Sequence, residues 1–187
     1  MIFKELPIKG SYEIDLKKIG DERGFFARFF CVNEYKEHDL KNNIVQINNS
    51  FTAEAYTLRG LHYQMPPKTE TRIVRVLKGA VYDVMLDLRP NSPTFKKWHG
   101  TKLTEENRKM VYVPDGCAHG FMTLEPDTEF LYLVTEFYSP ENEKVIRWND
   151  PEFNIEWPHE PKNLTDKDKN AIDFDPAYHL ENMEEVE

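Results

Sequence analysis

The sequence predicts an all-β protein, a jelly-roll barrel with short flanking helices. Proline, glycine and asparagine recur at short intervals along its 187 residues. Runs rich in β-branched and aromatic residues lie between these turn formers, which is typical of closely spaced antiparallel strands. Helical stretches are few and are expected only at residues 32–41 and in a C-terminal turn. The clearest strands are predicted at residues 72–77, 80–88, 109–113, 119–124 and 129–137.

The chain is expected to form one domain over residues 1–187. Its length suits a single core, and it contains no internal repeat and no Gly/Ser-rich linker. Lys78 and Gly79 separate the first two predicted strands, so a hairpin turn is predicted there. The acidic tail from about residue 181 is expected to be solvated. Closed β-folds often hold a ligand in the mouth of the barrel, so inward-facing polar residues are the candidates for a site.

Composition argues against several classes of protein. The net charge of −9 disfavours nonspecific binding to nucleic acid or to anionic membranes. The first residues do not resemble a signal peptide and no stretch approaches the roughly 18 apolar residues of a membrane span, so a cytoplasmic location is expected. Cys31 and Cys117 are the only cysteines and have no CxxC spacing, which predicts neither a disulfide framework nor a zinc site. A phosphate-bearing ligand would need a local basic cluster.

Two segments place histidines where they could face one cavity. Residues 58–64 (LRGLHYQ) contain His62, and residues 113–121 (VPDGCAHGF) place a Pro-Asp-Gly turn before His119. The second segment resembles the Pro-x-Gly-x-x-His element of cupins, which predicts a cupin-type jelly roll. Metal-binding cupins usually carry a His-x-His pair in the first segment, whereas here its second position is Gln64. The sequence therefore predicts no metal and makes His62 a general base that needs an orienting carboxylate.

An ordered set of motifs runs through the chain: DERGFF, LRGLHYQMPP, RIVRVLKG, DLRPNSPTF, VPDGCAHGF, FLYLVTEFYSPE and LTDKD. Together they resemble the dTDP-4-dehydrorhamnose 3,5-epimerase family over about residues 10–168. The resemblance implies a homodimer without metal or cofactor that inverts ring carbons beside the 4-keto group of a nucleotide-linked 6-deoxyhexose. It implies that His62 abstracts the proton, that Asp168 orients and charges this base, and that Tyr132 is the acid on the opposite face. The residues that it implies in holding the nucleotide diphosphate and sugar are Arg23, Gln46, Asn48, Arg59, His119, Tyr138 and Lys167.

The chemistry of such a reaction explains these residue types. A C–H bond next to a ketone is acidic only if the enolate is stabilised, so the enzyme needs a base at the hydrogen and donors at the ketone oxygen. Inversion then requires a proton from the other face, which His62 and Tyr132 can achieve from different strands. Arg59, Arg23 and Lys167 supply the positive charge that a diphosphate needs. Without the resemblance, Tyr132 would be interpreted as a core tyrosine and the three cations as surface charge.

Two residues depart from the family's usual pattern. Arg72, two residues after Glu70 where glutamine is common, replaces a lysine that reaches the ketone oxygen, and it keeps the charge with a different reach. Arg28 replaces a glutamate close to the thymine ring. A carboxylate accepts the N3–H of thymine, whereas an arginine suits the N3 and O2 acceptors of cytosine. Arg28 therefore favours a CDP sugar, with a dTDP sugar as the alternative. A CDP-linked 3,6-dideoxy sugar would leave only C5 to invert, and the sequence does not decide between inversion at C5 and at both C3 and C5.

Two other functions remain open at this point. A metal-dependent cupin oxygenase or isomerase would use His62, Glu70 and His119 as ligands, and metal analysis would separate it from the epimerase. A non-catalytic protein that binds nucleotide sugars would be indicated by loss of the base or the acid. The presence of His62, Tyr132 and Asp168 disfavours this second alternative.

Overall fold

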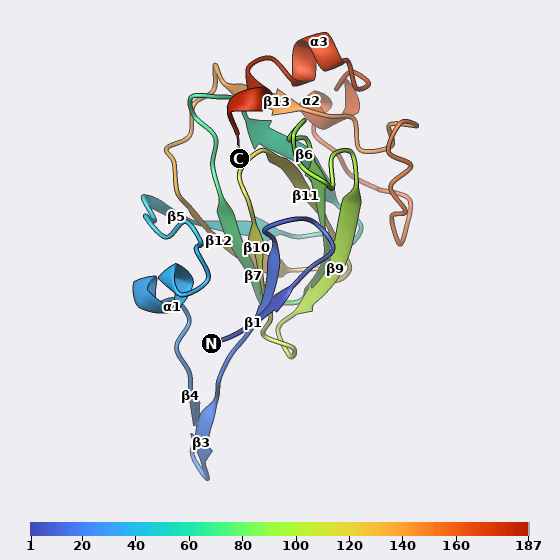
Figure 1. The fold of residues 1–187 in the computed structure, drawn as a ribbon. Coiled ribbons are helices and arrows are strands. Elements are labelled where there is room, and N and C mark those ends of the chain that lie inside the picture. The colour runs from blue at the N-terminus through green and yellow to red at the C-terminus, as the bar shows by residue number, and fades with distance from the viewer. Residues whose placement is uncertain (187) are drawn as a thin grey trace.

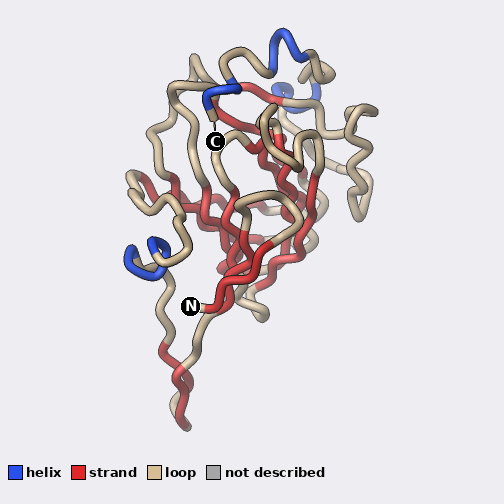
Figure 2. Tube along the Cα trace, viewed as in Figure 1, coloured by secondary structure: helices blue, strands red, loops and turns tan. Residues whose placement is uncertain are grey.

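The structure, a computed structural model, describes residues 1–186 and is dominated by two antiparallel sheets (Figure 1 and Figure 2). One sheet has six strands in the order β1-β2-β10-β7-β12-β5, and these are β1 (Ile2–Glu5), β2 (Tyr12–Asp15), β5 (Gln46–Thr52), β7 (Arg72–Lys78), β10 (Met110–Val113) and β12 (Thr128–Val134). The other has five in the order β13-β6-β11-β8-β9, and these are β6 (Leu58–Gln64), β8 (Ala80–Asp87), β9 (Trp98–Thr104), β11 (Cys117–Thr123) and β13 (Glu143–Val145). The predicted all-β class is confirmed, and the five strands predicted most clearly all form.

Small elements surround the two sheets. A separate hairpin of β3 (Ile19–Asp21) and β4 (Gly24–Phe26) extends away from the body of the molecule (Figure 1). The helices are short, as predicted: α1 (Val32–Lys36), α2 (Asp166–Lys169), α3 (Pro176–His179) and the 3₁₀ turn η1 (Met183–Glu185). The helix expected at residues 32–41 ends early, and Asp39 shortly after it adopts a left-handed backbone with φ of 56°.

Apolar side chains from both sheets form the core between them. Val74 and Val76 of β7 point inward and belong to the same buried cluster as Val81 and Met85 of β8, each at most 1% exposed. The inward positions follow the two-residue period of a strand. Burial of such a side chain contributes about 1.5–3 kcal/mol. This packing holds the sheets at a fixed separation, and the same strands carry the polar residues of the site at their inward positions beyond the core.

The outer face of each sheet is also covered. Tyr35 of α1 packs with Ile73 and Leu133 on the outside of the six-stranded sheet. The C-terminal segment packs Met183 and Val186 against the outside of the five-stranded sheet. The chain after residue 165 forms α2, which lies close to β6.

The C-terminal tail is anchored, so the expectation that it is solvated from about residue 181 is wrong. Met183 is 0% exposed and Val186 is 6% exposed, whereas Glu184 and Glu185 face the solvent. Residues three apart lie on the same side of a 3₁₀ turn, which brings both apolar side chains onto the sheet. The acidic composition of this segment gave no indication that Met183 and Val186 would be buried.

The predicted hairpin at Lys78 and Gly79 is also wrong. The strands on either side, β7 and β8, belong to different sheets, so the chain changes sheet at this point. Gly79 has a φ of +77°, and a Cβ there would lie 2.5 Å from Oγ1 of Thr128. A tight turn with glycine serves both a hairpin and a change of sheet, so the local sequence does not distinguish the two.

Candidate active site

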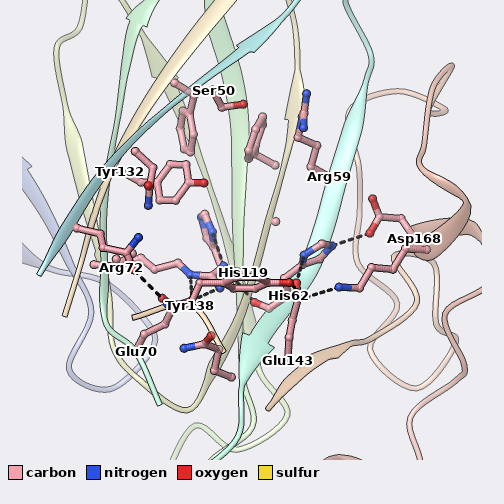
Figure 3. Close-up of a pocket in the computed structure, with 18 of the residues that line it drawn as sticks. Ser50, Arg59, His62, Glu70, Arg72, His119, Tyr132, Tyr138, Glu143 and Asp168 are labelled. Carbon is pink, nitrogen blue, oxygen red and sulfur yellow. Dashed lines mark hydrogen bonds and ion pairs between the residues drawn. The ribbon is translucent and has the colours of Figure 1, made fainter. Parts of the chain in front are cut away.

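A cavity of about 690 Å³ lies between the two sheets, and it collects most of the predicted site residues (Figure 3). Gln46 and Asn48 of β5 face into it, while Ile47 between them is 64% exposed, as the two-residue period of a strand requires. The predicted residues that line the cavity are Gln46, Asn48, Arg59, His62, Arg72, His119, Tyr132, Tyr138, Lys167 and Asp168.

The two central residues come from opposite walls. His62 lies on β6 of the five-stranded sheet, where it pairs with His119 of β11. Tyr132 lies on β12 of the six-stranded sheet, between Asn48 of β5 and Val74 of β7. Figure 3 shows Tyr132 across the cavity from His62. A planar intermediate held between the walls would present one face to each side chain.

His62 is bonded at both ring nitrogens. Its Nε2 lies 2.6 Å from Oδ1 of Asp168, and its Nδ1 lies 2.9 Å from Oε1 of Glu143. Burial alone would lower the pKa of His62, but the hydrogen bonds to Asp168 and Glu143 outweigh it and raise this pKa above its ordinary value. The imidazole therefore lies in surroundings that favour its protonated form.

A helix cap presents Asp168 to the histidine. Thr165 is the N-cap of α2, where its hydroxyl accepts the backbone N–H of Asp168 at 3.2 Å and donates to Oδ2 of that residue at 2.9 Å. The Asp168 residue is only 1% exposed. Its carboxylate is thus fixed by its own helix and has its second oxygen free for His62.

Glu143 connects His62 to two of the predicted substrate-binding residues. Its carboxylate accepts a hydrogen bond from the hydroxyl of Tyr138 at 2.7 Å and forms an ion pair with Lys167. The hydrogen bond with His62, together with those from Lys167 and Tyr138, lowers the pKa of Glu143 to about 2 against the opposing effect of burial. Sequence reasoning missed this residue, because one glutamate in the charged segment YSPENEK has no spacing that separates it from a surface residue.

Arg72 belongs to a second network on the cavity wall. Its Nε donates to Glu70 at 2.9 Å, and its Nη1 donates to the backbone carbonyl of His62 at 3.1 Å. His119 is held at Nε2 by the buried carboxylate of Asp83, 2.8 Å away, which leaves its Nδ1 3.5 Å from Arg72. Glu70 is therefore the ion-pair partner of Arg72. In residues 1–186 no three His, Cys, Asp or Glu side chains group as metal ligands.

Arg23 and Arg28 lie outside the cavity. Arg23 sits at the tip of the β3–β4 hairpin, fully exposed, and pairs with Asp21. Arg28 follows the hairpin, is also exposed and pairs with Glu34 at 2.7 Å. Neither arginine lines the chain's own cavity, and the hairpin projects from the body of the molecule (Figure 1). The expectation that Arg28 lies beside the pyrimidine is therefore not met within one chain.

Comparison with known proteins agrees with this geometry. The family model for dTDP-4-dehydrorhamnose 3,5-epimerase matches residues 5–175. The chain belongs to this family. It is 43% identical over 159 residues to the dTDP-4-dehydrorhamnose 3,5-epimerase of Shigella flexneri, covering 84% of this chain and 87% of the relative. It is therefore an isomerase of the epimerase class, and the alternative of a metal-dependent oxygenase is not supported.

Solved structures of family members share the fold. The enzyme from Bacillus anthracis, solved with TDP and pyrophosphate bound, has a TM-score of 0.88 and 39% identity, over 92% of this chain and 100% of that one. An epimerase from Legionella pneumophila in complex with dTDP-4-keto-L-rhamnose has a TM-score of 0.84 and 40% identity, over 91% of this chain and 90% of that one. These similarities confirm the predicted cupin-type jelly roll. Among the residues that the structure describes, no helix has the length and apolarity to cross a membrane.

Proposed function

We propose that the enzyme inverts C3 and C5 of a dTDP-linked 4-keto-6-deoxyhexose. The observation that carries this proposal is the placement of His62, bonded to Asp168, across a cavity from Tyr132 (Figure 3). One wall supplies a base and the other a phenolic acid, which is the arrangement that inversion at a carbon beside a ketone requires. The ligand named in the Legionella structure is a sugar of this class.

The proton moves from carbon to His62 and returns from Tyr132. When a nitrogen of His62 takes the C–H proton, the electron pair of that bond enters the enolate and negative charge develops on the ketone oxygen. Arg72 of β7, whose Nη1 lies 3.5 Å from Nδ1 of His119, stabilises this oxygen. Tyr132 then donates its phenolic proton to the opposite face of the carbon. Water restores the proton of Tyr132 and removes the proton of His62, so the cycle closes without an oxidant or reductant.

The remaining cavity residues hold the nucleotide part. Lys167 and Arg59 provide positive charge and Tyr138 a hydroxyl for the diphosphate, while Gln46 and Asn48 offer amide groups. The bound TDP of the Bacillus relative supports a thymidine nucleotide. The CDP hypothesis rested on a contact between Arg28 and the base, which a single chain does not make, because Arg28 lies outside its own cavity and meets a base only from the hairpin of a second copy.

Arg23 and Arg28 are expected to act in the cavity of a second copy of the chain. The hairpin that carries Arg23 exposes Ile19 and Phe26, each 70% exposed, and β5 is an edge strand with an exposed Phe51. Apolar residues on a projecting hairpin and an open strand edge beside the cavity suit an interface between copies. We expect a homodimer in which each hairpin reaches the partner's cavity.

Solvent exchange tests the reaction. The enzyme, incubated with dTDP-4-keto-6-deoxyglucose in D₂O, should incorporate deuterium at C3 and C5, read position by position by NMR. His62→Asn should abolish this exchange while dTDP still binds, because the base contributes little to holding the nucleotide. Exchange at the wild-type rate in His62→Asn would refute the assignment. Light scattering measures the mass of the particle in solution, and a monomer would refute the dimer.

A further inference from the structure

The free enzyme has no nitrogen of His62 open for a proton. Nε2 faces Asp168 at 2.6 Å and Nδ1 faces Glu143 at 2.9 Å. Two carboxylates at the two ring nitrogens are both satisfied only by the imidazolium, which donates to each. A histidine accepts a proton only through a free lone pair, so one of these two contacts must open before His62 acts as a base.

The surroundings decide which carboxylate moves. Asp168 is fixed by the Thr165 cap and is 1% exposed. Glu143 has a longer side chain, and its other two partners, Tyr138 and Lys167, are the residues proposed above to meet the diphosphate. The negative charge that attracts Lys167 and the hydroxyl of Tyr138 repels the carboxylate of Glu143.

We propose that Glu143 is a positioning residue that locks His62 between two carboxylates in the free enzyme and is displaced from Nδ1 when the diphosphate of the substrate binds. This inference rests on the proposed function, since it takes the ligand to be a nucleotide diphosphate sugar. Displacement leaves His62 with Asp168 alone. The imidazolium then loses its proton to water, and the free Nδ1 takes the proton of the sugar C–H bond.

The other charged groups around His62 do not replace Glu143. Asp168 bonds His62 from α2, Arg72 acts on it from β7, and His119 pairs with it from the neighbouring strand β11, while Lys167 pairs with Glu143. Arg72 is a cation and disfavours the imidazolium. Glu143 and Asp168 are therefore the groups that hold the proton on His62, and removal of either charge makes this proton easier to lose.

The contact between Glu143 and His62 makes the pKa of His62 higher in the free enzyme than in the enzyme–substrate complex, so the two differ in pH dependence. The acid limb of kcat/KM reports the free enzyme and that of kcat reports the enzyme–substrate complex. In the wild type the acid limb of kcat/KM should lie at a higher pH than that of kcat. Glu143→Gln keeps the size of the side chain and removes the charge, and it should lower the acid limb of kcat/KM by about one pH unit, so that the two limbs approach each other.

An NMR titration tests the lock without any substrate. The Hε1 resonance of His62, assigned with the His62→Asn variant, should titrate at a lower pH in Glu143→Gln than in the wild type, by about one unit. Adding dTDP to the wild type should move the titration in the same direction. Glu141→Gln is the matched control, the same substitution on an exposed residue of the same loop, and it should change neither value.

Two results would overturn the proposal: an unchanged His62 titration in Glu143→Gln, or coincident acid limbs of kcat and kcat/KM in the wild type. Glu143→Asp, which keeps the charge but draws it back by one methylene, gives the same test if the glutamine variant does not fold, and should shift the titration downward by a smaller amount. Failure of the proposed function is distinguishable, because a wild type that shows no exchange with the keto sugar could still show the lowered titration in Glu143→Gln.

Discussion

Replacing Asp168 by asparagine tests the negative charge that Asp168 places beside His62, because the two side chains have nearly the same shape. Asp168→Asn keeps the side-chain volume and leaves the backbone N–H of residue 168 on Thr165, but it removes the negative charge 2.6 Å from Nε2 of His62. The imidazolium that forms during proton abstraction loses its fixed counter-charge. A hydrogen bond to a charged group contributes about 1.5–3 kcal/mol, which corresponds to a loss of about 10- to 150-fold in the rate of proton abstraction.

The assay is the rate of deuterium incorporation from D₂O at saturating keto sugar. Asp166→Asn is the control, because it makes the same change on an exposed residue of the same helix and should leave the rate unaltered. Binding of dTDP, measured by calorimetry, should be similar in the wild type and both variants. A loss smaller than about threefold in a folded Asp168→Asn protein would refute the view that this carboxylate charges the base.

Three further predictions concern the acid, the nucleotide and the tail. Tyr132→Phe removes the acid and keeps the base, so exchange at the C–H bond should persist while inversion falls sharply, and equal loss of both by NMR would contradict an opposite-face acid. Calorimetry should show dTDP binding about tenfold more tightly than CDP, and Arg28→Glu, which supplies an acceptor for the N3–H of thymine, should not narrow this preference; tighter binding of CDP would restore the cytidine hypothesis. Met183→Ala should lower the free energy of unfolding by about 2–5 kcal/mol in a urea titration, whereas Glu184→Ala next to it should change it by less than about 0.5 kcal/mol.

The site residues that were predicted from the sequence, such as His62 and Asp168, lie in segments that resemble motifs of the family. His62 and Asp168 lie 106 positions apart, and only the resemblance of both segments to one family joined them before the structure placed them 2.6 Å apart. Tyr132 had no local feature that distinguished it from a core tyrosine. The period of β12 explains its position, since Phe130 and Val134 on the same face also line the cavity.

The parts that the sequence did not predict depend on contacts between distant segments. Glu143 carries no motif, and its role appears only when β13 pairs with β6 and brings it beside His62. Gly79 shows the same limit for the fold. The turn at Gly79 can be predicted from local residues, whereas the sheet that each flanking strand joins depends on pairing with strands farther along the chain. Met183 and Val186 were hidden by the acidic residues around them.

The charges in the cavity show how an acidic protein can bind a diphosphate. Among the described residues Arg72 is paired with Glu70, Lys167 with Glu143, and His62 with both Glu143 and Asp168, and Arg59 is the cavity cation that has no carboxylate partner. Under the proposed function, the diphosphate binds by exchanging partners within the site as well as by attraction to its cations. Such an exchange couples binding to catalysis, because the carboxylate that gives up Lys167 is the one bonded to His62. A site with unpaired lysines would bind the phosphates as well but would have no means of linking their arrival to the state of the base.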